Sequence, residues 1–113
     1  MKNITPGHRY ELENFEGNDK PGQIIQFIEK VPKATLNANV TDASYPGELV
    51  TLHDGTTNEE VMAMIIDRMN YLQSKFPCRE NAIAITHFET GLMWLEKRTA
   101  DRLKRGVEGK HLK

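Results

Sequence analysis

Several features that mark particular classes of protein are scarce in this chain of 113 residues. Its single cysteine, Cys78, excludes an intramolecular disulfide and suits a reducing compartment. No apolar run is long enough to span a bilayer, and the first residues lack the charged and then apolar pattern of a leader peptide. We therefore expect a cytoplasmic protein that does not enter a membrane.

Motifs that carry common chemistries are missing as well. The four histidines are scattered without an i, i+4 pair, an HExxH or a CxxC, and neither common phosphate loop, GxxxxGKS/T or GxGxxG, occurs. Cys78 and His87 are the candidates for a nucleophile and its base, but they lie nine residues apart around the start of a predicted helix. We expect Cys78 to be a small hydrophobic residue, buried or half-buried at the turn before that helix. We expect no catalytic residues, no metal and no cofactor.

The composition is that of an ordinary globular domain, with 38% hydrophobic and 27% charged residues. A chain of this length forms one domain with a modest core. Because an interface between identical chains would add stability that such a core lacks, we expect a homo-oligomer.

Short segments with β character fill the first half of the chain. HRYELENF, residues 8–15, alternates apolar and polar side chains, and QIIQFIEKV, residues 23–31, is rich in β-branched residues. The turn signal GNDKPG, residues 17–22, lies between them and predicts a hairpin. ELVTLH, residues 48–53, predicts a third, shorter strand, and residues 32–47 predict a loop.

Two helices are predicted after these strands. DGTTNEE, residues 54–60, starts the first, because its threonines can cap a helix and its acids suit the positive helix end. This helix ends before Pro77. The second runs from near Arg79 to near Gly106. Its apolar residues recur at helical steps: Ile85, Phe88, Leu92 and Leu95.

Together these elements predict an α+β fold, in which a small antiparallel sheet of two or three strands precedes a long antiparallel two-helix hairpin. The sheet is expected in residues 1–53, the helical hairpin in residues 54–109 and a flexible tail in residues 110–113. We expect all three to belong to a single compact domain.

The segment ENAIAITHFETGLMW, residues 80–94, interrupts the apolar pattern of the second helix with polar residues and with Gly91. Met93 and Trp94 lie outside the apolar stripe, so the helix is apolar over more than one face. This pattern favours contact with another copy of the chain, which Gly91 would allow to come close. Ordinary packing against the sheet is an equal alternative.

Charge is distributed unevenly along the chain. Residues 96–113 hold seven basic and three acidic side chains, a net charge of +4, whereas residues 1–95 carry −5. Arg98, Arg102 and Arg105 share one face of the second helix, and arginine binds phosphate through two parallel hydrogen bonds. A small anion fits this pattern better than duplex DNA, which the acidic body would repel. An equal alternative is a solvated helix end whose arginines lie in water or pair with Asp101.

The second helix resembles that of a known family. Arg79, a short Ala/Ile run and the stretch THFETGLM (residues 86–93) are similar to the C-terminal helix of the phage cyclic-nucleotide sponges of the anti-CBASS and anti-Thoeris types. DGTTNEEV and ADRLKRGVEG resemble the anti-Thoeris branch, in which strands precede the helical hairpin. The resemblance covers roughly residues 54–109. In the anti-CBASS branch an N-terminal helix supplies the dinucleotide contacts, and strands are predicted in its place here.

The resemblance implies a non-enzymatic protein that acts in the cytoplasm of a bacterial host cell during phage infection. Such proteins bind cyclic nucleotide signals, either glycocyclic ADP-ribose or cyclic di- and trinucleotides, and hold them without cleavage. They assemble as homo-oligomers, from dimers to hexamers. The resemblance and the chemistry of a cyclic nucleotide together point to Phe76, Arg79, Asn81, Thr86, Thr90, Arg98, Arg102 and Arg105. Trp94, if exposed, is the alternative to Phe76 for stacking on a base.

Two other functions stay open at the level of sequence. One is a homo-oligomeric phage interaction protein or DNA-associated protein that uses the basic face of the second helix, although the acidic body disfavours nucleic acid. The other is a small hydrolase that uses Cys78 or His87.

Overall fold

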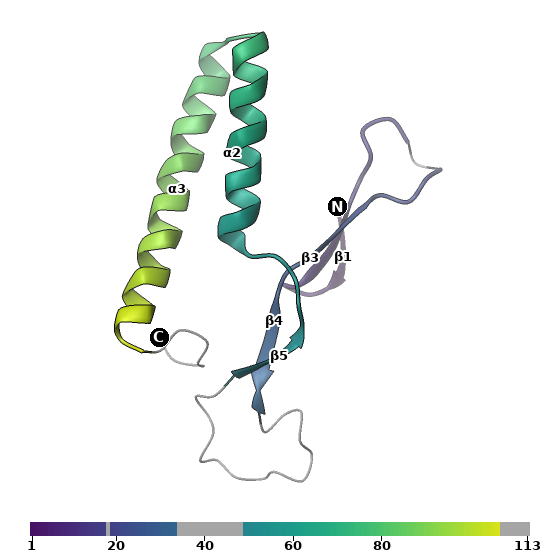
Figure 1. Ribbon diagram of the computed structural model, residues 1–113. Coiled ribbons are helices and arrows are strands. Elements are labelled where there is room, and N and C mark those ends of the chain that lie inside the picture. Colours follow the sequence, from purple (N-terminus) through teal and green to yellow (C-terminus); the bar gives the residue numbers. More distant parts are fainter. Residues whose placement is uncertain (18, 34–48, 107–113) are drawn as a thin grey trace. The chain divides into compact units, whose positions relative to one another are not determined.

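The computed structural model describes residues 1–17, 19–33 and 49–106 (Figure 1). Within these residues the chain forms five strands followed by two helices, which confirms the α+β class. The strands belong to one compact unit, Met1–Thr57, and the helices to a second unit that begins at Asn58. Most of the predicted loop at 32–47, and the whole of the predicted tail at 110–113, lie outside the described residues.

The first unit contains two small antiparallel sheets. Strands β1 (Lys2–Thr5), β2 (Arg9–Leu12) and β3 (Gln23–Gln26) form one sheet in that order, and β4 (Glu29–Pro32) pairs with β5 (Leu49–His53) in the other. The predicted hairpin is confirmed in the pairing of β2 with β3, and the predicted third strand is confirmed as β5. Strand β1, however, was not predicted, and the segment at 23–31 forms two strands rather than one.

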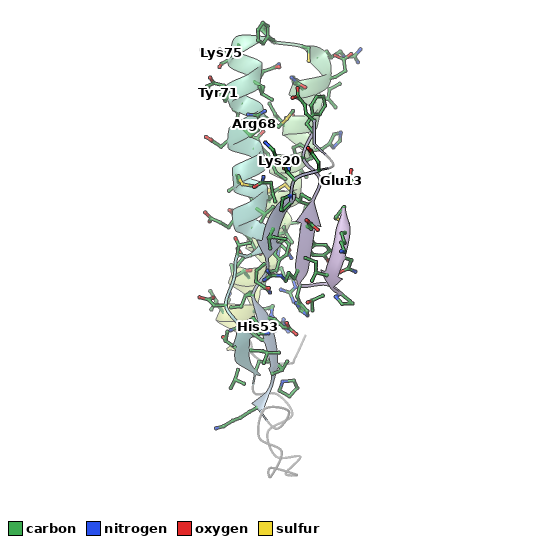
Figure 2. All side chains as sticks on the ribbon, turned by 90° about the vertical axis from the view of Figure 1, so that its right-hand side faces the viewer. Glu13, Lys20, His53, Arg68, Tyr71 and Lys75 are labelled. Atoms are coloured by element: carbon green, nitrogen blue, oxygen red, sulfur yellow. The ribbon has the colours of Figure 1, made fainter. Side chains whose placement is uncertain are left out.

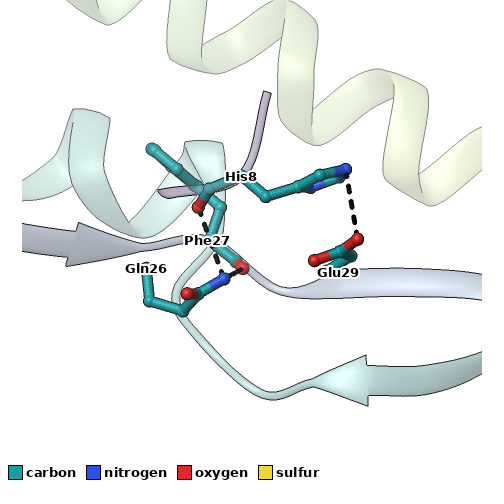
Figure 3. A network of polar contacts seen from close by, with 4 residues as sticks. All are labelled: His8, Gln26, Phe27 and Glu29. Atoms are coloured by element: carbon teal, nitrogen blue, oxygen red, sulfur yellow. Dashed lines mark hydrogen bonds and ion pairs between the residues drawn. The ribbon is translucent and has the colours of Figure 1, made fainter. Parts of the chain in front are cut away.

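The segment splits because its backbone changes partner after Gln26. The amide of Phe27 donates to the carbonyl of His8 at 2.7 Å, and the amide of Ile28 donates to the carbonyl of Thr56 at 2.8 Å. The Gln26 side chain spans this junction, since its Nε2 donates to the carbonyl oxygens of Phe27 at 2.7 Å and His8 at 3.4 Å (Figure 3). One chain segment therefore serves two sheets.

Close backbone approach at this junction requires a residue without a side chain. The amide of Thr56 donates to the carbonyl of Gln26 at 2.9 Å, which brings Gly55 against the same strand. A Cβ at Gly55 would lie 2.3 Å from the Gln26 carbonyl oxygen, a distance that no side chain tolerates. The glycine of the DGTT segment thus ends the β unit rather than serving only as a helix-start signal.

The second unit is a helical hairpin. Helix α2 (Asn58–Lys75) and helix α3 (Arg79–Lys104) lie side by side and antiparallel, joined by residues 76–78 (Figure 1). Both helices match the predicted limits, and Gly106 follows the second with a positive φ of 71°. Helix α3 has 26 residues and is therefore about 39 Å long. Neither helix has the length and apolar character to cross a membrane.

The two helices meet along a seam with a seven-residue repeat. One set of buried and half-buried residues of α3 recurs at alternating steps of four and three, and a set on α2 follows the same repeat, which is the pattern of helices that pack knobs into holes. Ala84 and Gly91 of α3, and Val61, Ile65 and Leu72 of α2, are half-buried beside these sets. The seam residues of α3 are Asn81, Ile85, Phe88, Leu92, Leu95, Thr99 and Arg102. Those of α2 are Glu59, Met62, Ile66, Met69 and Gln73.

Polar residues close the seam near both ends, where water can reach it. The Thr99 hydroxyl donates to a Glu59 carboxylate oxygen at 3.3 Å near the open end of the hairpin. Near the turn, Gln73 bonds the backbone of Cys78 in both directions. These bonds fix the register of α2 against α3, because a slip by one residue would break them.

The apolar core of a single chain is small. Among the described residues, only Ile85, 8% exposed, and Arg102, 6% exposed, are buried. Large apolar side chains stay exposed, including Phe76 at 81% and Trp94 at 59%. A chain that buries so little apolar surface gains little hydrophobic stabilisation by itself.

Truncation of the best-buried seam residue tests the seam. Ile85→Ala is expected to lower the free energy of unfolding by about 2–5 kcal/mol, because it removes buried methyl groups and leaves a cavity. Leu103→Ala is the control, since Leu103 is 64% exposed on the same helix, and its cost should stay within about 0.5 kcal/mol. Urea unfolding followed by helical circular dichroism, at one protein concentration, measures both. Equal costs would contradict the seam.

Candidate functional site

The side of α3 opposite the seam presents apolar and hydroxyl groups to solvent. We call Ile83, Thr86, Thr90, Met93 and Trp94 the outer face of α3; all five side chains are exposed. Ile83 is 44%, Met93 55% and Trp94 59% exposed. An apolar stripe on a face that α2 does not cover is typical of a contact surface.

Gly91 is half-buried and lies between the outer face and the seam, three residues before Trp94 and four before Leu95. A Cβ placed there would meet nothing within 4 Å, so no contact within the chain explains the glycine. Glycine in a helix interior is less favourable than alanine by about 1 kcal/mol. The cost is unexplained within one chain, which favours close approach by something outside it.

The two threonines of the outer face keep part of their hydrogen-bonding capacity. The Thr86 hydroxyl donates to the carbonyl of Ala82 at 3.2 Å, and the Thr90 hydroxyl donates to the carbonyl of Thr86 at 2.9 Å. A hydroxyl that donates within the helix still has lone pairs to accept a bond from outside. Both are therefore acceptors on an otherwise apolar face.

The tip of the hairpin carries the first group of predicted site residues, Phe76, Arg79 and Asn81. Phe76 and Arg79 are exposed, and Asn81 is half-buried at the end of the seam. Gln73 holds the turn: its Oε1 accepts from the amide of Cys78 at 3.0 Å, and its Nε2 donates to the carbonyl of Cys78 at 2.8 Å. The tip is thus a braced turn that presents an aromatic ring and a guanidinium.

The expectation that Cys78 is buried or half-buried is wrong. Cys78 is exposed, and its Sγ accepts from the amide of Asn81 at 3.4 Å as the N-cap of α3. A thiol is small and a weak acceptor, and a cap position must face the open helix end, so the side chain stays at the surface. Its role here is to start the helix.

An open groove of about 370 Å³ lies at the C-terminal end of α3. Among the described residues it is lined by Trp94, Lys97, Arg98, Asp101, Arg102 and Arg105. We call it the cationic groove, because four of these side chains are cations. Five of them lie on α3 and Arg105 is its C-cap, so the end of this helix sets their spacing.

The members of the cationic groove differ in availability. Arg98 and Arg105 are exposed, whereas Arg102 is 6% exposed and belongs to the seam. Asp101 accepts from the Lys97 ammonium at 3.1 Å, so its partner is a lysine and not one of the predicted arginines. Lys97 lies four residues before Asp101, and this spacing on a helix was the signal in the sequence that could have predicted the ion pair.

The predicted site residues therefore fall into separate regions. Arg79 and Arg102 are separated by 23 residues of continuous helix, which is about 35 Å along α3. Thr86 and Thr90 lie between them on the outer face. A small ligand held by one chain can contact the tip or the cationic groove, but not both.

Comparison with known proteins bears on this arrangement. The family described as Acb2/Tad1, hairpin domain, matches residues 32–100. The chain belongs to this family. A similar protein, Thoeris anti-defense 1 from Bacillus phage SBSphiJ7, is 46% identical over 98 residues, which cover 86% of this chain and 64% of that relative. The match thus spans less than two thirds of the relative's length.

The resemblance seen in the sequence is confirmed by these matches. The matched residues of the hairpin family include β5, α2 and most of α3, and therefore the hairpin tip, the outer face and Trp94. The last groove residues, Asp101, Arg102 and Arg105, follow the end of the family match and lie in the last turn of α3 and at its C-cap.

Removal of the Gln73 brace tests the tip. Gln73→Ala should lower the free energy of unfolding by about 1–3 kcal/mol, because the Cys78 amide and carbonyl lose their partners. Ser74→Ala is the neighbouring control: the Ser74 hydroxyl donates only to the carbonyl of Tyr71 within α2, and its loss should cost under about 0.5 kcal/mol. Chemical unfolding measures both, and equal costs would show that the brace does not hold the turn.

Proposed function

We propose that this protein is a phage-encoded anti-defence protein that binds cyclic nucleotide immune signals in the cytoplasm of the infected bacterium and sequesters them uncleaved. The signals are glycocyclic ADP-ribose, cyclic di- or trinucleotides, or both classes. The observation that carries the proposal is the cationic groove, in which an exposed indole lies beside guanidinium groups on a helix of the hairpin family. The relative from a Bacillus phage, named for anti-defence against Thoeris, supports the same function.

The groove offers the two kinds of contact that a cyclic nucleotide needs. Arg98 and Arg105 are exposed and can each bind a phosphate through two parallel hydrogen bonds. The indole of Trp94, 59% exposed, can stack on a base for about 1–3 kcal/mol. Buried Arg102 would contribute its charge more than its hydrogen bonds.

The tip provides a second set of contacts of the same chemistry. Phe76 is 81% exposed and can stack on a base, while Arg79 can bind a phosphate and Asn81 can read a base edge. Because the nearest groove residue, Trp94, lies about 22 Å along α3 from Arg79, we assign the tip and the groove to different ligand contacts. Thr86 and Thr90 would accept hydrogen bonds from a ligand or from a second chain between these regions.

A second chain is needed for tight binding. Sequestration requires nanomolar affinity, about −12 kcal/mol, and pockets that reach it enclose most of the ligand. The described lining of the groove lies along one helix, and such an open lining by itself would leave one side of a ligand in water. We therefore propose a homo-oligomer, from dimer to hexamer, in which the outer face of α3 contacts another copy and closes the ligand site.

Binding without cleavage agrees with the chemistry of the groove. Its cations stabilise phosphate in the bound state, and Asp101, the one acid among the described lining residues, pairs with Lys97. Cys78 caps a helix more than 20 Å along α3 from the groove, at about 1.5 Å per residue, so it cannot attack a phosphate held there.

Charge removal at the groove tests ligand binding. Arg105→Gln should weaken binding of the preferred cyclic nucleotide by about 10- to 100-fold, the effect of losing a charged hydrogen bond worth about 1.5–3 kcal/mol. Lys104→Gln removes the same charge from a neighbouring residue that does not line the groove. Its affinity should change by less than about threefold, because water and salt screen a charge at the surface. Isothermal titration with glycocyclic ADP-ribose, cyclic di- and trinucleotides, and duplex DNA measures both variants.

The titration separates the competing functions. Binding of a cyclic nucleotide with a weaker Arg105→Gln variant supports sequestration. Heat from duplex DNA alone would instead support the DNA-associated alternative. No heat from any cyclic nucleotide at micromolar protein would disprove the proposal.

The proposed oligomer contact is tested at Gly91. Gly91→Leu should leave the hairpin folded, because a Cβ there has free space and leucine favours helix by about 0.8–1 kcal/mol over glycine. It should nevertheless lower the mass of the assembly, since the new side chain blocks close approach. Ala63→Leu adds a similar side chain at an exposed position on α2, away from the outer face of α3, and should preserve assembly. Light scattering after size exclusion reports the mass; an unchanged mass for Gly91→Leu would refute the contact.

A further inference from the structure

The cationic groove contains one acidic residue among its described lining, Asp101, although binding of phosphate requires only cations. The other ionic residues that the structure describes around the cationic groove are Lys97, Arg98, Arg102 and Arg105. A groove that served only to hold phosphate would bind more tightly without a carboxylate, since like charges repel. The acid therefore lowers the affinity for a bare anion, so its presence favours a ligand with which it can form hydrogen bonds.

The carboxylate can be released from its partner at little cost. Its Oδ2 accepts from the Lys97 ammonium at 3.1 Å, but both side chains are more than half exposed, at 56% and 58%. Ion pairs between exposed side chains contribute little to stability, because water and salt screen them. A ligand that offers a donor to Asp101 and a phosphate to Lys97 can therefore split the pair and satisfy both groups.

Asp101 differs from the rest of the lining in hydrogen-bonding type. Lysine and arginine only donate, and the indole of Trp94 offers one donor, whereas an ionised carboxylate accepts through two oxygens. A pair of adjacent donors matches those two oxygens. A guanine base has such a pair in its N1–H and N2–H groups, and a ribose with free 2′ and 3′ hydroxyls has another. The pairing edge of adenine sets a donor beside an acceptor and does not match.

The helix places this acceptor between the phosphate-binding groups. Trp94, Arg98, Asp101 and Arg105 follow one another at steps of four, three and four, so they form a row about 16 Å long. The amide of Arg105 donates to the carbonyl of Asp101 at 3.0 Å, which keeps this turn helical and fixes the row. A ligand stacked on Trp94 and held by either arginine has its donor edge within reach of Asp101.

We infer that Asp101 determines specificity: it makes the cationic groove select ligands that carry two adjacent hydrogen-bond donors, a guanine edge or a ribose diol, beside a phosphate. The inference rests on the proposed function, because it concerns the same groove. It adds that the preferred signal is chosen by donors as well as by charge.

The test compares Asp101→Asn with Glu96→Gln. Each variant removes one negative charge from the exposed surface of α3, but Glu96 does not line the groove. Three probes separate the chemistries: cyclic diguanylate carries guanine without a diol, cyclic ADP-ribose carries diols without guanine, and cyclic diadenylate carries neither. Isothermal titration of the intact wild-type protein and both variants gives nine affinities.

We expect the wild-type protein to prefer cyclic diguanylate or cyclic ADP-ribose over cyclic diadenylate, and the preferred probe identifies the source of the donors. Asp101→Asn should weaken that probe by about 10- to 100-fold, the discrimination typical of one bidentate contact. It should leave cyclic diadenylate equal or tighter, and Glu96→Gln should preserve the wild-type preference.

Other outcomes overturn the inference in distinguishable ways. A wild-type preference for cyclic diadenylate, or an Asp101→Asn variant that changes all three affinities by the same factor, would show that the carboxylate acts only through its charge, while sequestration itself would stand. No binding of any probe to the wild-type protein would count against the groove as a nucleotide site and so against both proposals.

Discussion

The packing of α2 against α3 is the interaction on which the rest of the molecule depends. Its seven-residue repeat commits one side of α3 to the seam, with Ile85 as its best-buried apolar side chain. The opposite side is thereby left free for the outer face and the groove. Because Gln73 and Thr99 add directional bonds near the two ends, the seam has one register, and the row of groove residues keeps one orientation.

The same packing leaves a single chain short of core. Outside the seam, the stripe of Arg68, Tyr71 and Lys75 on α2 is exposed, and the Lys75 ammonium lies over the Tyr71 ring at 5.6 Å (Figure 2). Such contacts at the surface add little stability. Association with another chain would bury more apolar surface and would also enclose the bound ligand. We therefore link oligomerisation to ligand binding.

The sequence predicted the parts of the fold that local rules determine. The helix limits followed from a capping segment, Pro77 and Gly106, and the β2–β3 pairing followed from alternation around a turn. The break between β3 and β4 and the existence of β1 were not predictable in this way. Both depend on which backbone groups near His8 and Thr56 come into reach, and that is a property of the folded chain.

The candidate site shows the same division. Spacing alone put Arg98, Arg102 and Arg105 on one helical region, but only packing showed that Arg102 is buried and that Asp101 pairs with Lys97. The exposure of Cys78 was mispredicted because a lone cysteine is usually a small buried side chain, and the sequence did not show that Cys78 caps α3. In ENAIAITHFETGLMW, by contrast, the sequence alone showed that Gly91 is an unfavourable residue for a helix that packs only within its own chain. The structure agrees, because a Cβ at Gly91 would meet nothing within 4 Å.

Native mass spectrometry of the protein mixed with glycocyclic ADP-ribose and a cyclic trinucleotide, followed by heating and analysis of the released small molecule, tests the central claim most directly. We expect an assembly of at least two chains with a whole number of bound ligands, and release of chemically unchanged ligand on heating. A ligand-free single chain, or release of a cleaved nucleotide, would contradict it.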